Sequence, residues 1–160
     1  MLKVVLVHPE IPWNAGNVGR TCAAAGAELH LVAPLGFSLS ERRLRRAGLD
    51  YWERLAPVVH ESLDAFLAAL PERADVLAFS AEGAREHWHA PYREDSWLVF
   101  GSESRGLPPR LRELWSARLH RVPMVAGARS LNLSTAAAVV LYEARRVAGG
   151  ARWDAGPTRA

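Results

Sequence analysis

Polar residues that could do chemistry gather in three places, each directly after a short apolar run. The first stretch, HPEIPWNAGNVGRTCAAAG (residues 8–26), follows Val4–Val7. A glycine-bearing turn between a strand and a helix often binds phosphate, because backbone N–H groups and the helix dipole converge there. The glycine spacing does not fit GxGxxG, the second strand ends without an acid, and no Gly-Lys-Ser/Thr follows. A dinucleotide loop and a Walker loop are therefore both excluded.

Four side chains of this first stretch need an explanation. Asn17 has the residue type of an N-cap and predicts a helix over 17–25. Asn14 and Arg20 flank that predicted helix start, and Arg20 stands in an otherwise small, apolar segment. Trp13 either stacks on an unpaired base, as aromatic residues do in RNA-binding proteins, or packs on the sheet.

The second and third clusters also lie between a predicted strand and a predicted helix. In LVFGSESRGLPPRL (98–111), Ser104 does not fit the GxSxG nucleophile elbow, which leaves Glu103 as the chemical candidate. An acid just beyond the carboxyl end of a parallel strand is where α/β sheets place ligand contacts. In VPMVAGARSLNLSTAA (122–137), polar residues alternate at Ser130, Asn132 and Ser134. One of them is predicted to be the N-cap, and three exceed what capping needs.

Strand and helix patterns alternate along the whole chain. Predicted strands cover 3–7, 28–33, 57–60, 75–80, 96–100 and 119–123, and predicted helices cover 17–25, 41–55, 62–70, 81–88, 108–115 and 132–147. Continuous apolar strands that alternate with helices predict an α/β fold, a parallel sheet covered by helices on both faces. We expect a single domain over residues 1–150, followed by a short tail over 151–160.

Composition limits the class of protein and of site. The 160 residues are 49% hydrophobic, enough for one core, and the single cysteine, Cys22, excludes a disulfide within the chain. We interpret Cys22 as a buried structural residue. No apolar run is long enough for a signal peptide or a membrane span, which favours a cytoplasmic protein. His87 and His89 lack a third ligand at suitable spacing, so no metal site is predicted.

The net charge of +3 is unevenly distributed, since four arginines, Arg42, Arg43, Arg45 and Arg46, stand within five residues. The guanidinium of arginine can bind two phosphate oxygens at once and can stack on bases, so the cluster fits a site for a nucleic-acid backbone. A solvated helix face, partly paired with nearby acids, explains the cluster equally well.

The last predicted helix is apolar nearly all round, which is typical of a helix buried on more than one side. Ala138, Val139 and Tyr142 extend its apolar surface beyond one stripe. Either a second subunit or the core of the same chain covers them.

The three clusters, in this order, resemble the three motifs of the SPOUT superfamily of RNA methyltransferases. More narrowly, EIPWNAGNVGRTCA, RRLRRAGLDY, GSESRGLP and VPMVAGARSLNLS are similar to stretches of the short bacterial tRNA 2′-O-methyltransferases that modify the wobble nucleotide, position 34. The resemblance covers essentially the whole chain. It implies methyl transfer from S-adenosyl-L-methionine to the ribose 2′-OH of that nucleotide in tRNA. It also implies a homodimer whose active sites are shared between subunits.

The resemblance further implies a fold detail and site residues. The C-terminal segment would be threaded into a trefoil knot. Cofactor contacts would come from Phe79, Gly101, Val122, Met124, Ser130 and Leu131, and the functional residues would be Asn14, Arg20, Glu103, Ser130 and Asn132. We expect Arg20 to bind the substrate phosphate and to stabilise the developing alkoxide, because a guanidinium normally stays protonated.

Two other functions fit part of these observations. The same chemistry on another tRNA site or on rRNA is one, although relatives with those targets often carry extra RNA-binding domains. A non-catalytic RNA-binding module that uses the arginine cluster is the other. Such a module has no need for the complete set of five functional residues.

Overall fold

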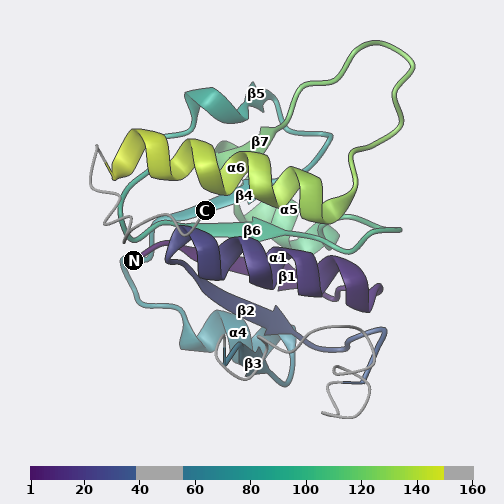
Figure 1. The fold of residues 1–160 in the computed structure, drawn as a ribbon, viewed down its shortest axis with the longest axis vertical. Coiled ribbons are helices and arrows are strands. Elements are labelled where there is room, and N and C mark those ends of the chain that lie inside the picture. The colour runs from purple at the N-terminus through teal and green to yellow at the C-terminus, as the bar shows by residue number, and fades with distance from the viewer. Residues whose placement is uncertain (39–55, 150–160) are drawn as a thin grey trace, which may run out of the picture.

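The computed structural model describes residues 1–38 and 56–149, which form a parallel sheet between layers of helices (Figure 1). Within the described residues, seven strands stand in the order β3-β2-β1-β6-β4-β7-β5, and every neighbouring pair is parallel. The strands are β1 (Lys3–Val7), β2 (Glu28–Val32), β3 (Val58–His60), β4 (Val76–Phe79), β5 (Arg85–Glu86), β6 (Trp97–Phe100) and β7 (Leu119–Arg121). The helices are α1 (Pro12–Ala25), α4 (Leu63–Ala69), α5 (Pro109–Leu114) and α6 (Leu133–Ala148), with 3-10 turns η1 (His87–His89) and η2 (Ser116–Arg118). The predicted α/β class is confirmed.

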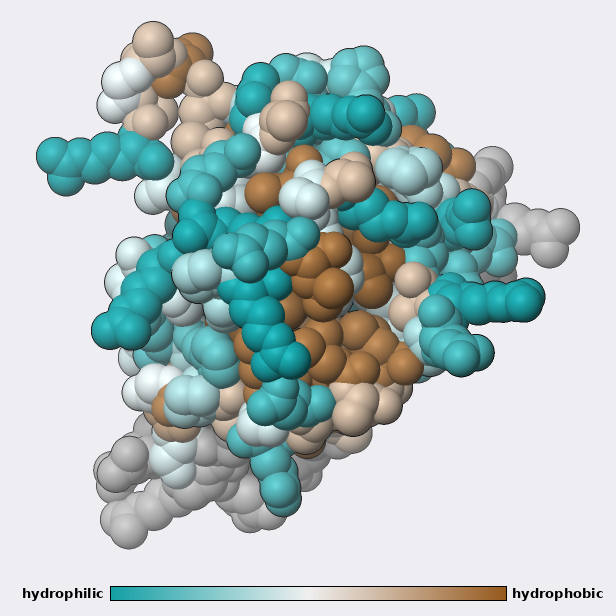
Figure 2. Space-filling view, turned by 180° about the vertical axis from the view of Figure 1, so that it is seen from behind, coloured by the Kyte–Doolittle hydropathy of each residue, from teal (hydrophilic) through white to brown (hydrophobic). Residues whose placement is uncertain are grey.

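Alternate side chains of the central strands enter two hydrophobic cores, one on each face of the sheet. Val4 and Leu6 of β1 belong to the core under α1 and α6, whereas Val5 and Val7 belong to the core under α4 and α5. This partition follows from the period of two along an extended strand. Figure 1 shows α1 and α6 side by side in front of the sheet, with α4 and α5 behind it. Seen from behind, hydrophobic side chains gather inside a hydrophilic rim (Figure 2).

Helix α1 begins earlier than predicted, at Pro12 rather than at residue 17. Its N-cap is Ile11, so Asn17 is not the N-cap, and Asn14 lies inside the helix rather than before it. Proline suits the first helical position because its fixed φ matches the helix and its missing N–H is not needed there. The helix ends at Gly26, whose φ of 62° is left-handed and carries no Cβ penalty for glycine.

Small side chains let α1 pack closely on the sheet and on α6. Ala15, Gly16, Gly19 and Cys22 are all buried. Burial raises the pKa of the Cys22 thiol to about 12, so the thiol stays protonated and unreactive at neutral pH. The structural interpretation of Cys22 agrees with this environment.

The predicted helix over 81–88 is wrong, because this segment forms β5 and η1 instead. A Cβ at Gly83 would lie 2.3 Å from the carbonyl carbon of His120, so the backbone here is pressed against β7. The segment then continues along β7 and pairs with it as the last strand of the sheet. Contact with a distant strand therefore overrides the local helical pattern.

Several predictions concern residues outside the described ranges. These are the helix over 41–55, the tail over 151–160 and the RNA-binding role of Arg42, Arg43, Arg45 and Arg46. The trefoil threading of the C-terminal segment also stays a prediction. Among the described helices, none combines the length and the apolar character that a membrane span requires. The described residues hold no group of three or more His, Cys, Asp or Glu side chains suited to a metal ion.

Two histidines on neighbouring strands share one hydrogen bond. His30 Nδ1 of β2 lies 3.0 Å from His60 Nε2 of β3, and the two rings are stacked. Burial is the main cause that lowers the pKa of both rings. The facing nitrogens cannot both carry a proton, which also disfavours a doubly charged pair.

We expect the free energy of unfolding to decrease as the pH falls below the ordinary histidine pKa of 6.5. Because both pKa values are lower in the folded chain, the unfolded chain binds more protons in this range, and acid favours unfolding. Urea unfolding at about pH 7.5 and about pH 5.5 measures the loss. His60→Asn should lose less stability between these two pH values than the wild type. An equal loss in both proteins would contradict a contribution from this pair.

Candidate active site

A cavity of about 430 Å³ opens where the carboxyl ends of β4, β6 and β7 meet the start of α1. Ligands of α/β proteins usually bind at this edge of the sheet, and the volume is typical of small-molecule sites. Its lining comes from α1, from the segments that follow β4, β6 and β7, and from α5 and α6. In Figure 1 the same edge carries the N-terminal end of α1 and the base of the loop between β7 and α6.

The carboxylate of Glu103 supplies the cap that α1 lacks. Its Oε2 accepts the backbone N–H of Glu10 at 2.7 Å, and its Oε1 accepts the backbone N–H of Ile11 at 3.1 Å. Oε1 also accepts a side-chain N–H of Asn14 at 2.9 Å. A negative acceptor at a helix N-terminus satisfies N–H groups that have no partner within the helix and interacts favourably with the helix dipole. Glu103 therefore holds the start of α1 in place.

The hydrogen-bond chain continues from Glu103 through Asn14 to Asn132. The buried Asn14 donates to Glu103, and its Oδ1 accepts a side-chain N–H of Asn132 at 2.9 Å. Asn132 is the N-cap of α6, one of the three residues predicted for that role, because its Oδ1 accepts the backbone N–H groups of Ser134 and Thr135. One polar chain thus links the starts of α1 and α6 to the loop after β6.

A second carboxylate, that of Glu10, joins the same two segments, and sequence reasoning missed it. Here the segment before α1 supplies the carboxylate and the loop after β6 supplies the donors. Oε1 of Glu10 accepts the hydroxyl of Ser104 at 2.6 Å, and Oε2 accepts the Ser104 backbone N–H at 3.1 Å. The turn before α1 and the loop after β6 are therefore joined by two carboxylates, one from each segment. These residues are 94 positions apart, so their pairing leaves no local pattern in the sequence.

The lining of the cavity has more apolar than polar surface. The six residues predicted to contact the cofactor all line it, namely Phe79, Gly101, Val122, Met124, Ser130 and Leu131. The rings of Phe79 and Phe100 are stacked, with their centroids 5.1 Å apart, and both belong to the lining. Such a cavity suits a ligand with a flat apolar part and a few polar groups.

At Gly101 two backbone segments approach each other closely at the wall of the cavity. A Cβ on Gly101 would lie 1.9 Å from the carbonyl carbon of Gly106, in a turn closed by backbone hydrogen bonds between Ser102 and Gly106. Only glycine lets the turn fold back over the end of β6.

Arg112 lines the cavity and pairs with Glu82, while its buried Nε has no hydrogen-bond partner in the described part of the chain. An acceptor atom on a bound ligand would satisfy this donor.

Arg20 lies apart from the other predicted functional residues. Asn14, Glu103, Ser130 and Asn132 all line the cavity, whereas Arg20 does not. Six positions after Asn14, Arg20 is about 240° further around the helix axis, and its side chain is exposed. A single chain therefore assembles the polar hydrogen-bond chain at the cavity without this arginine.

Comparison with known proteins identifies the family. The model described as the SpoU rRNA Methylase family matches residues 1–142. The chain belongs to this SpoU methylase family. A tRNA (cytidine(34)-2′-O)-methyltransferase of Burkholderia cenocepacia is 53% identical to this SpoU-family chain, over 93% of the chain and 97% of the relative. The resemblance that the three motifs indicated is thereby confirmed.

Solved structures share the SpoU fold with this chain. A protein studied for the 2-OH methylation of C/U34 on tRNA has a TM-score of 0.82 and 52% identity, over 91% of this chain and 89% of that protein. An AdoMet-bound rRNA methyltransferase from Sinorhizobium meliloti has a TM-score of 0.70 and 29% identity, over 91% of this chain and 56% of the other. The second of these proteins binds AdoMet on the fold that the SpoU-family chain adopts.

We expect Glu103→Gln to destabilise the SpoU-family chain by about 1–3 kcal/mol. Glutamine offers one acceptor oxygen in place of two, and its NH₂ group would face an N–H donor at the start of α1. Urea unfolding followed by circular dichroism measures the change. The control is Glu113→Gln, which alters an exposed acid of α5 and should stay within about 0.5 kcal/mol of the wild type. Equal stability of Glu103→Gln and the wild type would contradict the capping role.

Proposed function

We propose that this chain transfers a methyl group from S-adenosyl-L-methionine to the ribose 2′-OH of nucleotide 34 in tRNA. The observation that carries the proposal is the hydrogen-bond chain Glu103–Asn14–Asn132 at a largely apolar cavity. The near full-length similarity to a tRNA (cytidine(34)-2′-O)-methyltransferase supports the choice of substrate. The protein would act in the cytoplasm, where tRNA is modified.

The residues of the cavity fit this cofactor. S-adenosyl-L-methionine supplies a methyl group on a positively charged sulfur when it is bound. The residues that would hold it are Phe79, Gly101, Val122, Met124, Ser130 and Leu131. Their apolar surfaces suit the flat part of a nucleoside and keep water out, and the Nε of Arg112 offers a donor to a polar atom of the ligand.

The other site residues would orient the substrate and assist the removal of the proton from the 2′-OH. A guanidinium stays protonated at neutral pH, so we assign Arg20 to the substrate phosphate and to the oxygen that becomes negative. Because the guanidinium keeps its own proton, removal of the 2′-OH proton would require help from the substrate phosphate that Arg20 binds. We assign Glu103 and Asn132 to positioning through Asn14, since the acceptor oxygens of both accept N–H groups of the chain itself.

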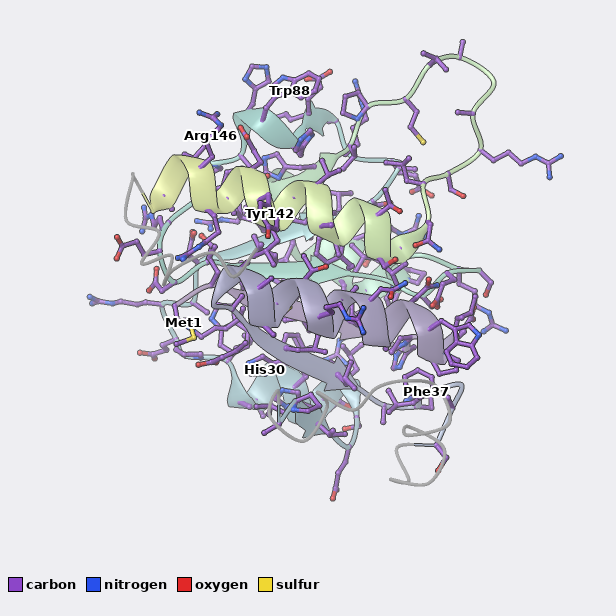
Figure 3. The ribbon with its side chains drawn as sticks, in the orientation of Figure 1. Met1, His30, Phe37, Trp88, Tyr142 and Arg146 are labelled. Atoms are coloured by element: carbon purple, nitrogen blue, oxygen red, sulfur yellow. The ribbon has the colours of Figure 1, made fainter. Side chains whose placement is uncertain are left out.

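A homodimer would complete this arrangement. Val139, Tyr142 and Val147 of α6 are exposed apolar side chains, and Tyr142 lies on the outer face of the helix, beside α1 (Figure 3). Two copies packed through α1 and α6 would cover them. Arg20 is exposed on α1 and does not line the cavity of its own chain, so in such a dimer it would serve the cavity of the second copy.

We expect the purified chain to transfer labelled methyl groups from S-adenosyl-L-methionine to unmodified tRNA, at the ribose of nucleotide 34. Nuclease mapping of the labelled tRNA identifies the nucleotide. Label at another nucleotide, or in rRNA alone, would contradict the proposed target. Calorimetric titration with S-adenosyl-L-methionine tests the cofactor separately, and a folded chain that does not bind it would be a non-catalytic module.

We expect Arg20→Lys to lower kcat about 100-fold, the scale on which removal of one transition-state donor acts. Lysine keeps the charge but loses the planar fork that binds two phosphate oxygens at once. Steady-state methylation with saturating tRNA and S-adenosyl-L-methionine measures kcat. Arg73→Lys changes an exposed arginine that does not line the cavity and is expected to retain wild-type turnover. Near-normal turnover by Arg20→Lys would exclude a specific role for the guanidinium.

A further inference from the structure

Trp13 is exposed over 56% of its surface, although it stands in the first turn of α1. Ile11 and Asn14, close to it in the sequence, both line the cavity. Ile11 is itself 41% exposed, and Leu131, another lining residue, is 38% exposed. The rim of the cavity therefore carries apolar side chains that the described part of the chain leaves open to solvent. None of the roles proposed for the other site residues involves Trp13.

Trp13, Asn17 and Arg20 form one stripe along α1. Spacings of four and then three residues bring side chains to the same face of a helix, and the seven residue steps from Trp13 to Arg20 span about 10 Å along its axis. All three side chains are exposed. The stripe places Trp13 on the same face of α1 as Arg20, the residue that we assign to the substrate phosphate, so in the proposed dimer both side chains would meet the same bound RNA.

Positive charges accompany this apolar rim. Arg105 is exposed and lines the cavity, and Arg129 is exposed in the loop before α6. Within residues 1–38 and 56–149, neither guanidinium takes part in a hydrogen bond or an ion pair. The nearby acids Glu10 and Glu103 are already bound to Ser104 and to N–H groups at the start of α1. Aromatic rings together with unpaired cations are the combination with which proteins bind single-stranded nucleic acid.

We propose that Trp13 stacks on an unpaired base that flanks the methylated nucleotide of the substrate RNA. This inference rests on the proposed function and extends it to a residue that selects and orients the substrate. Loop bases present open π-faces, and stacking on an aromatic side chain holds them without reading their edges. The positive charges at the rim favour RNA as the partner of Trp13 over a second copy of the chain. In the proposed dimer, the exposed apolar residues of α6 would provide the contacts between copies.

The test measures the Kd of a fluorescently labelled anticodon stem-loop in the presence of S-adenosylhomocysteine. We expect Trp13→Ala and Trp13→Leu to raise the Kd about ten-fold, and Trp13→Phe to stay within about three-fold, because stacking requires a ring. Trp88→Ala is the matched control and should bind like the wild type. Trp88 is also an exposed tryptophan, but it lies near β5, on the far side of α6 from α1 (Figure 3).

A second arm of the test removes one base at a time from the loop of the RNA. We expect one position at which an abasic nucleotide weakens binding to the wild type about ten-fold without weakening binding to Trp13→Ala any further. Losses that add at every position, or an unchanged Kd for Trp13→Ala, would overturn the inference. An equal loss for Trp88→Ala would also overturn it.

Two further outcomes separate this inference from others. Conversion of a dimer to a monomer by Trp13→Ala, seen by size-exclusion chromatography, would assign the side chain to contact between copies and overturn stacking. A wild-type chain that neither binds nor methylates tRNA would refute the proposed function. Wild-type methylation of nucleotide 34 with unchanged RNA binding by Trp13→Ala would refute the stacking alone.

Discussion

The site depends on the carboxylate of Glu103, which accepts three N–H donors at the start of α1. A helix that begins at a proline after Ile11 has no side-chain cap of its own, and N–H groups without partners there would be costly to bury. One carboxylate from the loop after β6 meets this need. As a consequence, the loop is tied by hydrogen bonds to the start of α1, and Asn14 lies where it can also bind Asn132.

The order of the strands explains why these segments meet. β1 and β6 are neighbours in the sheet, and β4 stands between β6 and β7, so the chain leaves β1, β6 and β7 at one edge. All the strands are parallel, and each of the three polar clusters follows one of these strands. Gly101 lets the loop after β6 turn back on itself at the same edge, where a Cβ would collide with the Gly106 backbone.

Side chains at this edge divide into two groups by exposure. Asn14 is buried, and it connects Glu103 to the cap of α6 within a hydrogen-bond chain that gives the cavity a defined shape. Trp13 and Arg20 belong to the same helix but point to solvent. Helix α1 thus presents one face to the interior of the site and another to solvent. The proposed function, with a small cofactor inside the cavity and an RNA strand across its rim, would need such a division.

Local patterns were sufficient for much of this protein. Apolar runs identified every described strand except β5. The strand–loop–helix context located the three polar clusters, and a residue type suited to capping placed the start of α6 near Asn132. Each of these signals acts over a few residues, which is the range that sequence periodicity records. The three clusters in order also identified the family, because their combination is far more specific than any one of them.

Tertiary structure decided the features that depend on distant partners. α1 begins at Pro12 because Glu103, from another loop, caps it, so the local choice of Asn17 was wrong. The segment over 81–88 follows the edge of β7 because Gly83 packs on a distant backbone. Glu10 binds Ser104 across 94 positions. By itself, the sequence determined which residues were available for the chemistry. The order of the strands in space decided which of them meet, because a carboxylate binds the donors that the fold brings within hydrogen-bond distance, however far apart they are in the chain.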